Sequence, residues 1–277
     1  MIRRSLRTAP VTWYTYSEAG GREVNEDCVG VAGNGDCRCF VVADGLGGHG
    51  KGEVASRLAV EAFEEVFSGA AADLSGAMST AFLLAQKRIL EEQRGAGTPF
   101  RMKTTAAALA IRGDAVMWGH IGDSRVYAFS RFRLKARTQD HSVPQMLALA
   151  GEIREREIRG HPDRSRLLRV LGEPGTPKFE QTGPLPLKKY RAFLLCSDGF
   201  WELVKEREML AALRRSADAR EWTEQMLRIV EQRGAGREMD NYSAVAVMVS
   251  SAAKQPNRTQ QAEVPHEKSE MCGRTFF

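Results

Sequence analysis

The stretch CRCFVVADGLGGHGKGEVAS, residues 37 to 56, decides the fold class. Its first seven residues are mainly apolar and predict a buried strand, which Asp44 and Gly45 follow at once. A glycine-rich turn comes next, and helical spacing of apolar residues begins near Glu53. Residues 193 to 199, FLLCSDG, repeat the order of apolar strand, aspartate and glycine. The repetition predicts sheet strands that end in aspartates and are followed by helices.

The rest of the chain alternates between paired helices and short strands. Helical spacing covers residues 53–67, 74–90, 201–213 and 219–232, and strands are expected at 104–111, 115–121, 125–130 and 242–249. The connectors Arg112-Gly113-Asp114 and Gly122-Asp123-Ser124 are short, which is typical of hairpins and predicts antiparallel pairing. The Arg-Gly-Asp tripeptide is therefore interpreted as a turn. We expect an α+β fold of antiparallel sheets covered by helices.

Composition indicates a folded, soluble protein. The chain has 277 residues, of which 43% are hydrophobic and 27% charged, which is ordinary globular usage. The early arginines are not followed by the apolar stretch of a secretory signal, and the apolar run at 244–249 is far too short to span a membrane. We expect a cytoplasmic protein without a membrane partner.

The cysteines and the net charge exclude few further classes of protein. Five cysteines form no even framework: Cys28, Cys37, Cys39, Cys196 and Cys272. Reduced thiols fit best, and for the pair at 37 and 39 ordinary packing is favoured over a soft-metal site. The formal charge of +5 and pI near 9.0 admit a polyanion without requiring one. Because glutamates interrupt the arginines between 154 and 169, we expect no nucleic-acid partner.

Four aspartates carry the expected chemistry. Asp44 and Asp198 follow buried strands, where a carboxylate is costly to desolvate unless a cation or several donors satisfy it. Asp27 and Asp240 lie at other strand edges, so the set suggests hard oxygen ligands for magnesium or manganese. For any one aspartate alone, the favoured explanation is a turn residue that bonds nearby amides. The set of four, without a histidine and cysteine cluster of the zinc type, favours the metal site.

The ordered motifs resemble the metal-dependent PPM serine/threonine phosphatases, also called type 2C, in their bacterial form. They span about residues 20 to 250 and occur in the family's order. They are REVNED at 22–27, VVADGLGGHGKGEVAS at 41–56, KTT at 103–105, GHIGDSRVY at 119–127, TQDHS at 138–142, GHPDRSRLLRVLG at 160–172, FLLCSDGFWELV at 193–204 and MDNYSAVAV at 239–247.

The resemblance implies an α/β/β/α sandwich, with residues 1–251 as one phosphatase domain and a flap at about 140–185. The polar stretch 252–277 is expected to be a disordered tail. The resemblance also implies two Mn²⁺ or Mg²⁺ ions. Asp44 would bridge them, Asp198 and Asp240 would complete the shell of the first ion, and the Gly45 carbonyl would bind the second. Asp27 would lie on the side of the second ion.

Further residues take roles from the same resemblance. Asp123 would hold a third, weaker ion, although its place in a short turn is also explained by capping that turn. Glu26 and Asn241 are candidates for direct or indirect metal contact. Metal-activated water would attack phosphorus, Arg22 would grip the phosphate oxygens through its planar fork, and His49 would protonate the departing serine or threonine oxygen.

The expected partners are phosphorylated proteins, the targets of a serine/threonine kinase, and the expected state is a monomer. Two alternatives stay open. One is a catalytically dead phosphatase fold that binds phosphoproteins, against which the intact aspartates, Arg22 and His49 argue. The other is a different two-metal enzyme, such as a nuclease or nucleotide hydrolase, whose substrate the arginines would grip. Assays on phosphopeptide and on DNA separate these alternatives.

Overall fold

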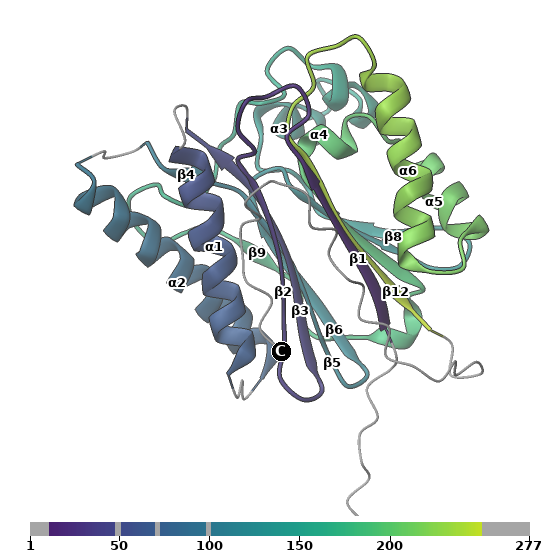
Figure 1. The fold of residues 1–277 in the computed structure, drawn as a ribbon, viewed down its shortest axis with the longest axis horizontal. Helices are drawn as coiled ribbons and strands as arrows, with labels where there is room; N and C mark the ends of the chain where they lie inside the picture. Colours follow the sequence, from purple (N-terminus) through teal and green to yellow (C-terminus); the bar gives the residue numbers. More distant parts are fainter. Residues whose placement is uncertain (1–10, 48–50, 70–72, 98–100, 251–277) are drawn as a thin grey trace, which may run out of the picture.

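The computed structural model describes residues 11–47, 51–69, 73–97 and 101–250. Two sheets of antiparallel strands pack face to face, and helices cover both outer faces (Figure 1). Helices α1 (Lys51–Ser68) and α2 (Leu74–Gly95) cover one sheet, and α5 (Glu206–Arg215) and α6 (Ala219–Gly234) cover the other. The predicted sandwich with paired helices is confirmed.

The larger sheet has seven strands, with the central order β10-β6-β5-β3-β2. The short strands β4 and β9 pair with β3 and β6, respectively. The bounds are β2 (Asp27–Ala32), β3 (Cys37–Leu46), β4 (Lys103–Thr104), β5 (Ala106–Arg112), β6 (Ala115–Ile121), β9 (Glu180–Gln181) and β10 (Leu185–Pro186).

The smaller sheet has five strands in the order β1-β12-β11-β7-β8. Their bounds are β1 (Val11–Glu18), β7 (Arg125–Phe129), β8 (Leu134–Arg137), β11 (Ala192–Cys196) and β12 (Tyr242–Val249). Strand β12 is the second strand of this sheet and pairs along its whole length with the edge strand β1, so strands from the two ends of the described chain are neighbours. Strand β1 is absent from the elements that the sequence predicted.

Alternation along the central strands divides the core into three layers. In β3, Cys39 and Val41 pack toward α1 and α2, whereas Phe40 and Val42 pack between the sheets. Residues two apart in a strand share a face, so these four residues show that both faces of β3 are buried. Burial on both faces explains why the sequence of β3 is a continuous apolar run. Asp44 is two residues beyond Val42, so it lies on the same face of β3 as Phe40 and Val42. This face is turned toward the opposite sheet.

One predicted hairpin is wrong. The turn at Arg112-Gly113-Asp114 does join the antiparallel strands β5 and β6. The turn at Gly122-Asp123-Ser124 instead carries the chain from β6 in the larger sheet to β7 in the smaller one. Strand β6 already has β5 on one edge and β9 and β10 on the other, so no edge is free for β7. Asp123 consequently lies at a crossover between the two sheets.

The helical segment predicted at 201–213 is broken in two. Helix α4 (Asp198–Trp201) begins at the aspartate itself, and α5 begins only at Glu206. The excursion between β8 and β11 contains α3 (Val143–Leu149), the 3₁₀ helix η1 (Glu155–Gly160), β9, β10 and a second 3₁₀ helix, η2 (Leu187–Lys189).

The described cysteines are free thiols. Cys28, Cys37, Cys39 and Cys196 are all buried, which agrees with the packing interpretation. Cys272 and the predicted tail at 252–277 lie outside the described residues. None of the helices in the described ranges has the length and apolar character needed to span a bilayer.

Candidate active site

Asp27 and Asp44 face each other at one end of the larger sheet. They are direct partners in the antiparallel register of β2 and β3. The backbone of Asp44 is fixed by Thr105, whose hydroxyl accepts a hydrogen bond from the Asp44 amide at 3.0 Å and whose amide donates to the Asp44 carbonyl at 2.9 Å. Two carboxylates are thus held side by side on a rigid strand pair.

Asp198 and Asp240 approach from the smaller sheet. Asp198 opens α4 directly after β11, and Asp240 precedes β12, the neighbour of β11. A bridge joins the two sheets here: the Ser197 hydroxyl donates to Oδ2 of Asp27 at 2.7 Å, and it accepts from the Ser243 amide at 2.9 Å. The four aspartates therefore meet where the ends of the two sheets come together.

Asp123 joins this group from the crossover turn. Its backbone carbonyl accepts a hydrogen bond at 2.9 Å from the indole nitrogen of Trp201. Burial, and then the nearby charge of Asp198, raises the pKa of the Asp123 carboxyl well above its ordinary value. The structure brings Asp27, Asp44, Asp123 and Asp198 into one electrostatically coupled cluster.

Burial and mutual repulsion shape the protonation of this cluster. Burial, opposed by hydrogen bonds from Ser197 and Ser243, raises the pKa of Asp27 to about 7. Burial, followed by the charges of Asp27 and Asp198, raises the pKa of Asp44 well above its ordinary value. The pKa of Asp198 is also raised, first by burial and then by Asp240. Positive charge placed among these carboxylates would relieve their repulsion.

The donor set fits a hard divalent cation. Oδ1 of Asp27 is buried, and among the described residues no donor forms a hydrogen bond to it. This arrangement costs free energy unless a cation satisfies the oxygen. All the clustered side chains offer carboxylate oxygens, the ligands that Mg²⁺ and Mn²⁺ prefer. Asp27, Asp44, Asp198 and Asp123 are the residues that would hold such ions.

The aspartates form a loose set in this structure. Among the described residues, a single group of three His, Cys or carboxylate side chains has ligand atoms that all lie within 4.8 Å of one another, and it contains none of these aspartates. Asp240 is occupied elsewhere: Oδ2 accepts from Arg22 at 3.0 Å and Oδ1 accepts from the Asn241 amide at 2.9 Å. An ion shared by Asp44, Asp198 and Asp240 would require these carboxylates to draw closer together.

The compact group is His120, His141 and Glu180, and its hydrogen bonds argue against metal ligation. Nδ1 of His141 accepts from the Gly122 amide at 3.2 Å, so the proton of the neutral ring is on Nε2 and points toward Glu180 at 3.3 Å. A metal on Nε2 would need the opposite tautomer. The group instead fastens the loop after β8 to the crossover turn that carries Asp123.

Arg22 lies at the rim of the aspartate cluster. Its guanidinium forms a half-exposed ion pair with Asp240, and the charge of Asp198 also acts on it. A guanidinium in this position can reach an anion that enters from solvent. The role in phosphate binding stays a prediction.

Glu26 and Gly45 pack against the start of α1. Oε1 of Glu26 accepts from the Gly52 amide at 3.2 Å, where the positive end of the helix dipole favours a carboxylate. The Gly45 amide donates to the Glu26 carbonyl at 3.0 Å. A Cβ at Gly45 would lie 2.2 Å from the Gly52 carbonyl oxygen, so the site needs glycine here. Neither contact tests metal binding by these residues.

The side chain of Asn241 holds three backbone groups in place, and we call this arrangement the backbone clamp. Its Oδ1 accepts from the Glu26 amide at 2.9 Å, and its Nδ2 donates to the carbonyls of Ala19 and Val24 at 2.9 and 3.0 Å. These bonds seat the loop that carries Arg22 and Glu26. They supply an indirect role, and direct metal contact stays a prediction.

Some site residues have roles that the sequence did not assign. Thr105, Ser197 and Trp201 hold the aspartates through hydrogen bonds, and all three lie within the motifs quoted above, which was the available signal. His49, the expected general acid, lies outside the described residues.

Comparison with known proteins identifies this architecture. Solved structures that share the two-sheet fold include Staphylococcus aureus serine/threonine phosphatase Stp1, with a TM-score of 0.81 at 22% identity over 91% of this chain and 100% of that one. The catalytic domain of the serine/threonine protein phosphatase PstP in complex with two manganese ions has a TM-score of 0.72 at 27% identity, covering 87% and 99% of the two chains. The class of protein is therefore a phosphatase of this two-sheet fold.

Sequence comparison defines the family. A family profile described as Protein phosphatase 2C matches residues 16–242. The serine/threonine phosphatase stp of Listeria monocytogenes serotype 4b is 35% identical over 196 residues, which are 68% of this chain and 77% of that protein. PstP of Mycobacterium tuberculosis is 32% identical over 232 residues, which are 82% of this chain and 43% of that longer protein. The chain belongs to the protein phosphatase 2C family, and it is a protein phosphatase.

Proposed function

We propose that this protein hydrolyses phosphoserine and phosphothreonine on other proteins with the help of two divalent cations, Mn²⁺ or Mg²⁺. A third, weaker ion near Asp123 belongs to the same proposal. The substrates are cytoplasmic targets of a serine/threonine kinase, and the protein acts as a monomer. The relatives named serine/threonine phosphatase and the structure of PstP with two manganese ions support this assignment.

The single observation that carries the proposal is the buried carboxylate cluster. Asp27, Asp44, Asp123 and Asp198 all have raised pKa values, first because they are buried and then because they lie near one another. Such a cluster is unfavourable by itself and becomes favourable around cations. Bound divalent cations supply activation of water and neutralisation of phosphate charge.

The protein's own side chains would bind the ions, bind the phosphate and protonate the leaving group. The aspartates would hold the ions, with Asp44 between them and the Gly45 carbonyl as a further ligand. Arg22 would exchange its contact with Asp240 for the phosphate oxygens, to which its planar fork is complementary. His49 would donate a proton to the leaving serine or threonine oxygen, since an alkoxide leaves poorly without one.

A phosphatase assay tests the proposal. The full-length protein is assayed on a phosphothreonine peptide with Mn²⁺, with chelator, and as the Asp198→Asn variant. We expect chelation and Asp198→Asn each to abolish activity, because both remove the cation site. Asp36→Asn is the matched control: Asp36 lies beyond the opposite end of β3 and contacts Arg112, so this variant should keep full activity.

Other substrates separate the alternatives. Phosphotyrosine peptide and DNA are offered under the same conditions, and neither should be hydrolysed at a comparable rate. Full activity after chelation would reject the proposed chemistry. Hydrolysis of DNA with steep salt dependence would favour a nuclease instead, and peptide binding without turnover by the wild type would favour a phosphoprotein-binding protein.

A further inference from the structure

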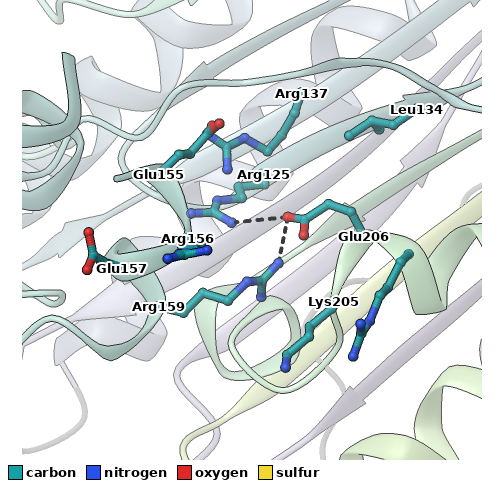
Figure 2. A pocket seen from close by; sticks show the side chains of 10 residues that line it. Arg125, Leu134, Arg137, Glu155, Arg156, Glu157, Arg159, Lys205 and Glu206 are labelled. Atoms are coloured by element: carbon teal, nitrogen blue, oxygen red, sulfur yellow. Dashed lines mark hydrogen bonds and ion pairs between the residues drawn. The ribbon is translucent and has the colours of Figure 1, made fainter. Parts of the chain in front are cut away.

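A basic hollow lies outside the aspartate site, between β8, η1 and the start of α5 (Figure 2). It holds about 780 Å³, within the size range of small-molecule sites. Six cationic side chains line it against three glutamates, which leaves a surplus of three positive charges. The cations are Arg125, Arg137, Arg156, Arg159, Lys205 and Arg207. We call this hollow the basic pocket.

The basic pocket is on the helix side of the smaller sheet. Arg125 shares its strand face with Tyr127 and Phe129, which pack toward the helices, whereas Val126 and Ala128 face the other sheet. The floor of the pocket is rigid: Arg125 is 1% exposed, donates two hydrogen bonds to Asp140 at 2.7 and 2.6 Å, and stacks on Trp201. The pocket is therefore a preformed feature separate from the cluster between the sheets.

Several cationic side chains of the basic pocket lack a full set of partners among the described residues. Nη1 of Arg159 is buried, and no residue in the described ranges accepts a hydrogen bond from it. Leaving such a donor unsatisfied is unfavourable, and more so for a charged group. Arg156, Lys205 and Arg207 make no ion pair with any described residue. The pocket presents more positive charge than the fold itself neutralises.

A carboxylate already occupies part of the anion position. Oε1 of Glu206 accepts from Arg159 at 2.6 Å and lies 4.0 Å from Arg125. Figure 2 shows Arg125 and Arg159 on this carboxylate, with Arg156 farther along the same pocket. The contacts of Glu206 indicate where an external anion would bind.

We propose that the basic pocket binds a small anion that carries at least two phosphate groups, of the nucleoside diphosphate class. A diphosphate carries roughly three negative charges near neutral pH, which matches the surplus. Arginine forks suit phosphate oxygens through paired hydrogen bonds, and the pocket offers several. The hollow is also large enough for a group attached to the phosphates.

Titration calorimetry with ADP tests the proposal on the full-length protein in buffer without divalent cations, so that the diphosphate keeps its full negative charge. We expect one site per chain. Arg156→Ala should weaken binding about tenfold, because an exposed arginine beside the anion is lost. Glu206→Gln should tighten binding several-fold, because the competing carboxylate is neutralised. Arg220→Ala removes an equally positive but distant side chain that pairs with Glu224, and it should leave the affinity unchanged.

Further ligands and variants locate the site. Pyrophosphate should bind and adenosine should not, if the phosphates provide the recognition. Asp198→Asn should bind ADP normally, which separates this pocket from the proposed catalytic site. The proposal is overturned if ADP does not bind, if Asp198→Asn abolishes binding, or if Arg156→Ala and Glu206→Gln both behave like Arg220→Ala in variants whose thermal unfolding matches the wild type.

Discussion

Asn241 illustrates how one side chain can organise the backbone around a site. It is 7% exposed, and its three hydrogen bonds hold backbone groups of Ala19, Val24 and Glu26. We expect Asn241→Ala to lower the free energy of unfolding by roughly 2–3 kcal/mol, because buried backbone groups lose their partners. Urea denaturation in the presence of chelator measures this effect in isolation from metal binding.

The control is Asn34→Ala. The amide of Asn34 donates one exposed hydrogen bond, to the Ser68 carbonyl, so its loss should cost little. If Asn241→Ala leaves the stability of the chelated protein unchanged, the clamp interpretation is wrong and a role through metal becomes the better account.

His141 makes a separate prediction about pH. It stacks on His120, with ring centroids 4.6 Å apart, and Glu180 and Arg169 also face it. Burial, and then the charge of His120, lowers the pKa of His141 to about 4. Because the folded pKa is below the ordinary value, its contribution to stability is present above pH 6.5 and is lost as pH falls through 4. The loss is on the order of 2 kcal/mol.

NMR titration of the histidine ring protons checks the pKa directly, and His141→Gln identifies the signal. Urea unfolding of both proteins between pH 7 and 4 should show a steeper decline for the wild type. A titration midpoint near 6.5 for His141 would contradict the buried, neutral ring that the structure contains.

The candidate metal ligands were easier to predict than the residues that hold them in place. Asp44 and Asp198 stood out because a carboxylate after an apolar strand is unusual unless it has a partner. Ser197 and Trp201 gave no such signal, since a serine or tryptophan beside a strand has many ordinary explanations. Their roles depend on which distant residue they meet, Asp27 in one case and Asp123 in the other. These contacts depend on the tertiary fold, so the local sequence does not reveal them.

At the scale of elements, similar local sequences gave different structures. Asp44 and Gly45 remain inside strand β3, whereas Asp198 and Gly199 open helix α4. The pairing of Gly45 with Thr104 in β4 continues the first strand. Whether the chain continues as a strand after Asp44 or turns into a helix at Asp198 depends on the neighbouring elements. The failed hairpin at Gly122 has the same cause, because strand β7 found its partners in the other sheet.

The junction of β3 and α1 depends on close backbone contact. A Cβ at Gly45 would lie 2.2 Å from the Gly52 oxygen and 2.6 Å from the Glu26 oxygen, and both atoms are backbone. We expect Gly45→Ala to destabilise the protein by about 3 kcal/mol or more. Because the helix must move, hydrogen exchange should accelerate first in α1. Gly183→Ala, where no atom lies within 4 Å, is the matched control and should change neither measurement.

At the scale of the molecule, the layered fold was predictable because its central strands are apolar on both faces. Phe40 and Phe193, from different sheets, meet in the middle layer, while Cys39 and Leu194 face the helices. Such double burial produces continuous apolar runs, which mark buried strands. The order of strands within each sheet does not follow from these runs, since it depends on long-range pairing.

The two sheets contribute different aspartates to one site, so bound cations should link the halves of the sandwich. Asp27 and Asp44 come from the larger sheet, and Asp198 and Asp240 from the smaller one. A ligand that binds only the folded state at a hundred times its Kd adds about 2.7 kcal/mol. We therefore expect Mn²⁺ to raise Tm by about 5–10 °C relative to chelated protein, measured by calorimetry.

The size of this increase should depend on pH and on Asp198. Because burial raises the pKa of Asp27 to about 7, protons compete with cations below that pH. In metal-free protein the raised pKa contributes stability below the ordinary pKa, and this contribution is lost as pH rises through 7. The increase with Mn²⁺ should thus be larger at pH 8 than at pH 6 and much reduced in Asp198→Asn. Equal increases in wild type and Asp198→Asn would place the stabilising cation away from the junction of the sheets.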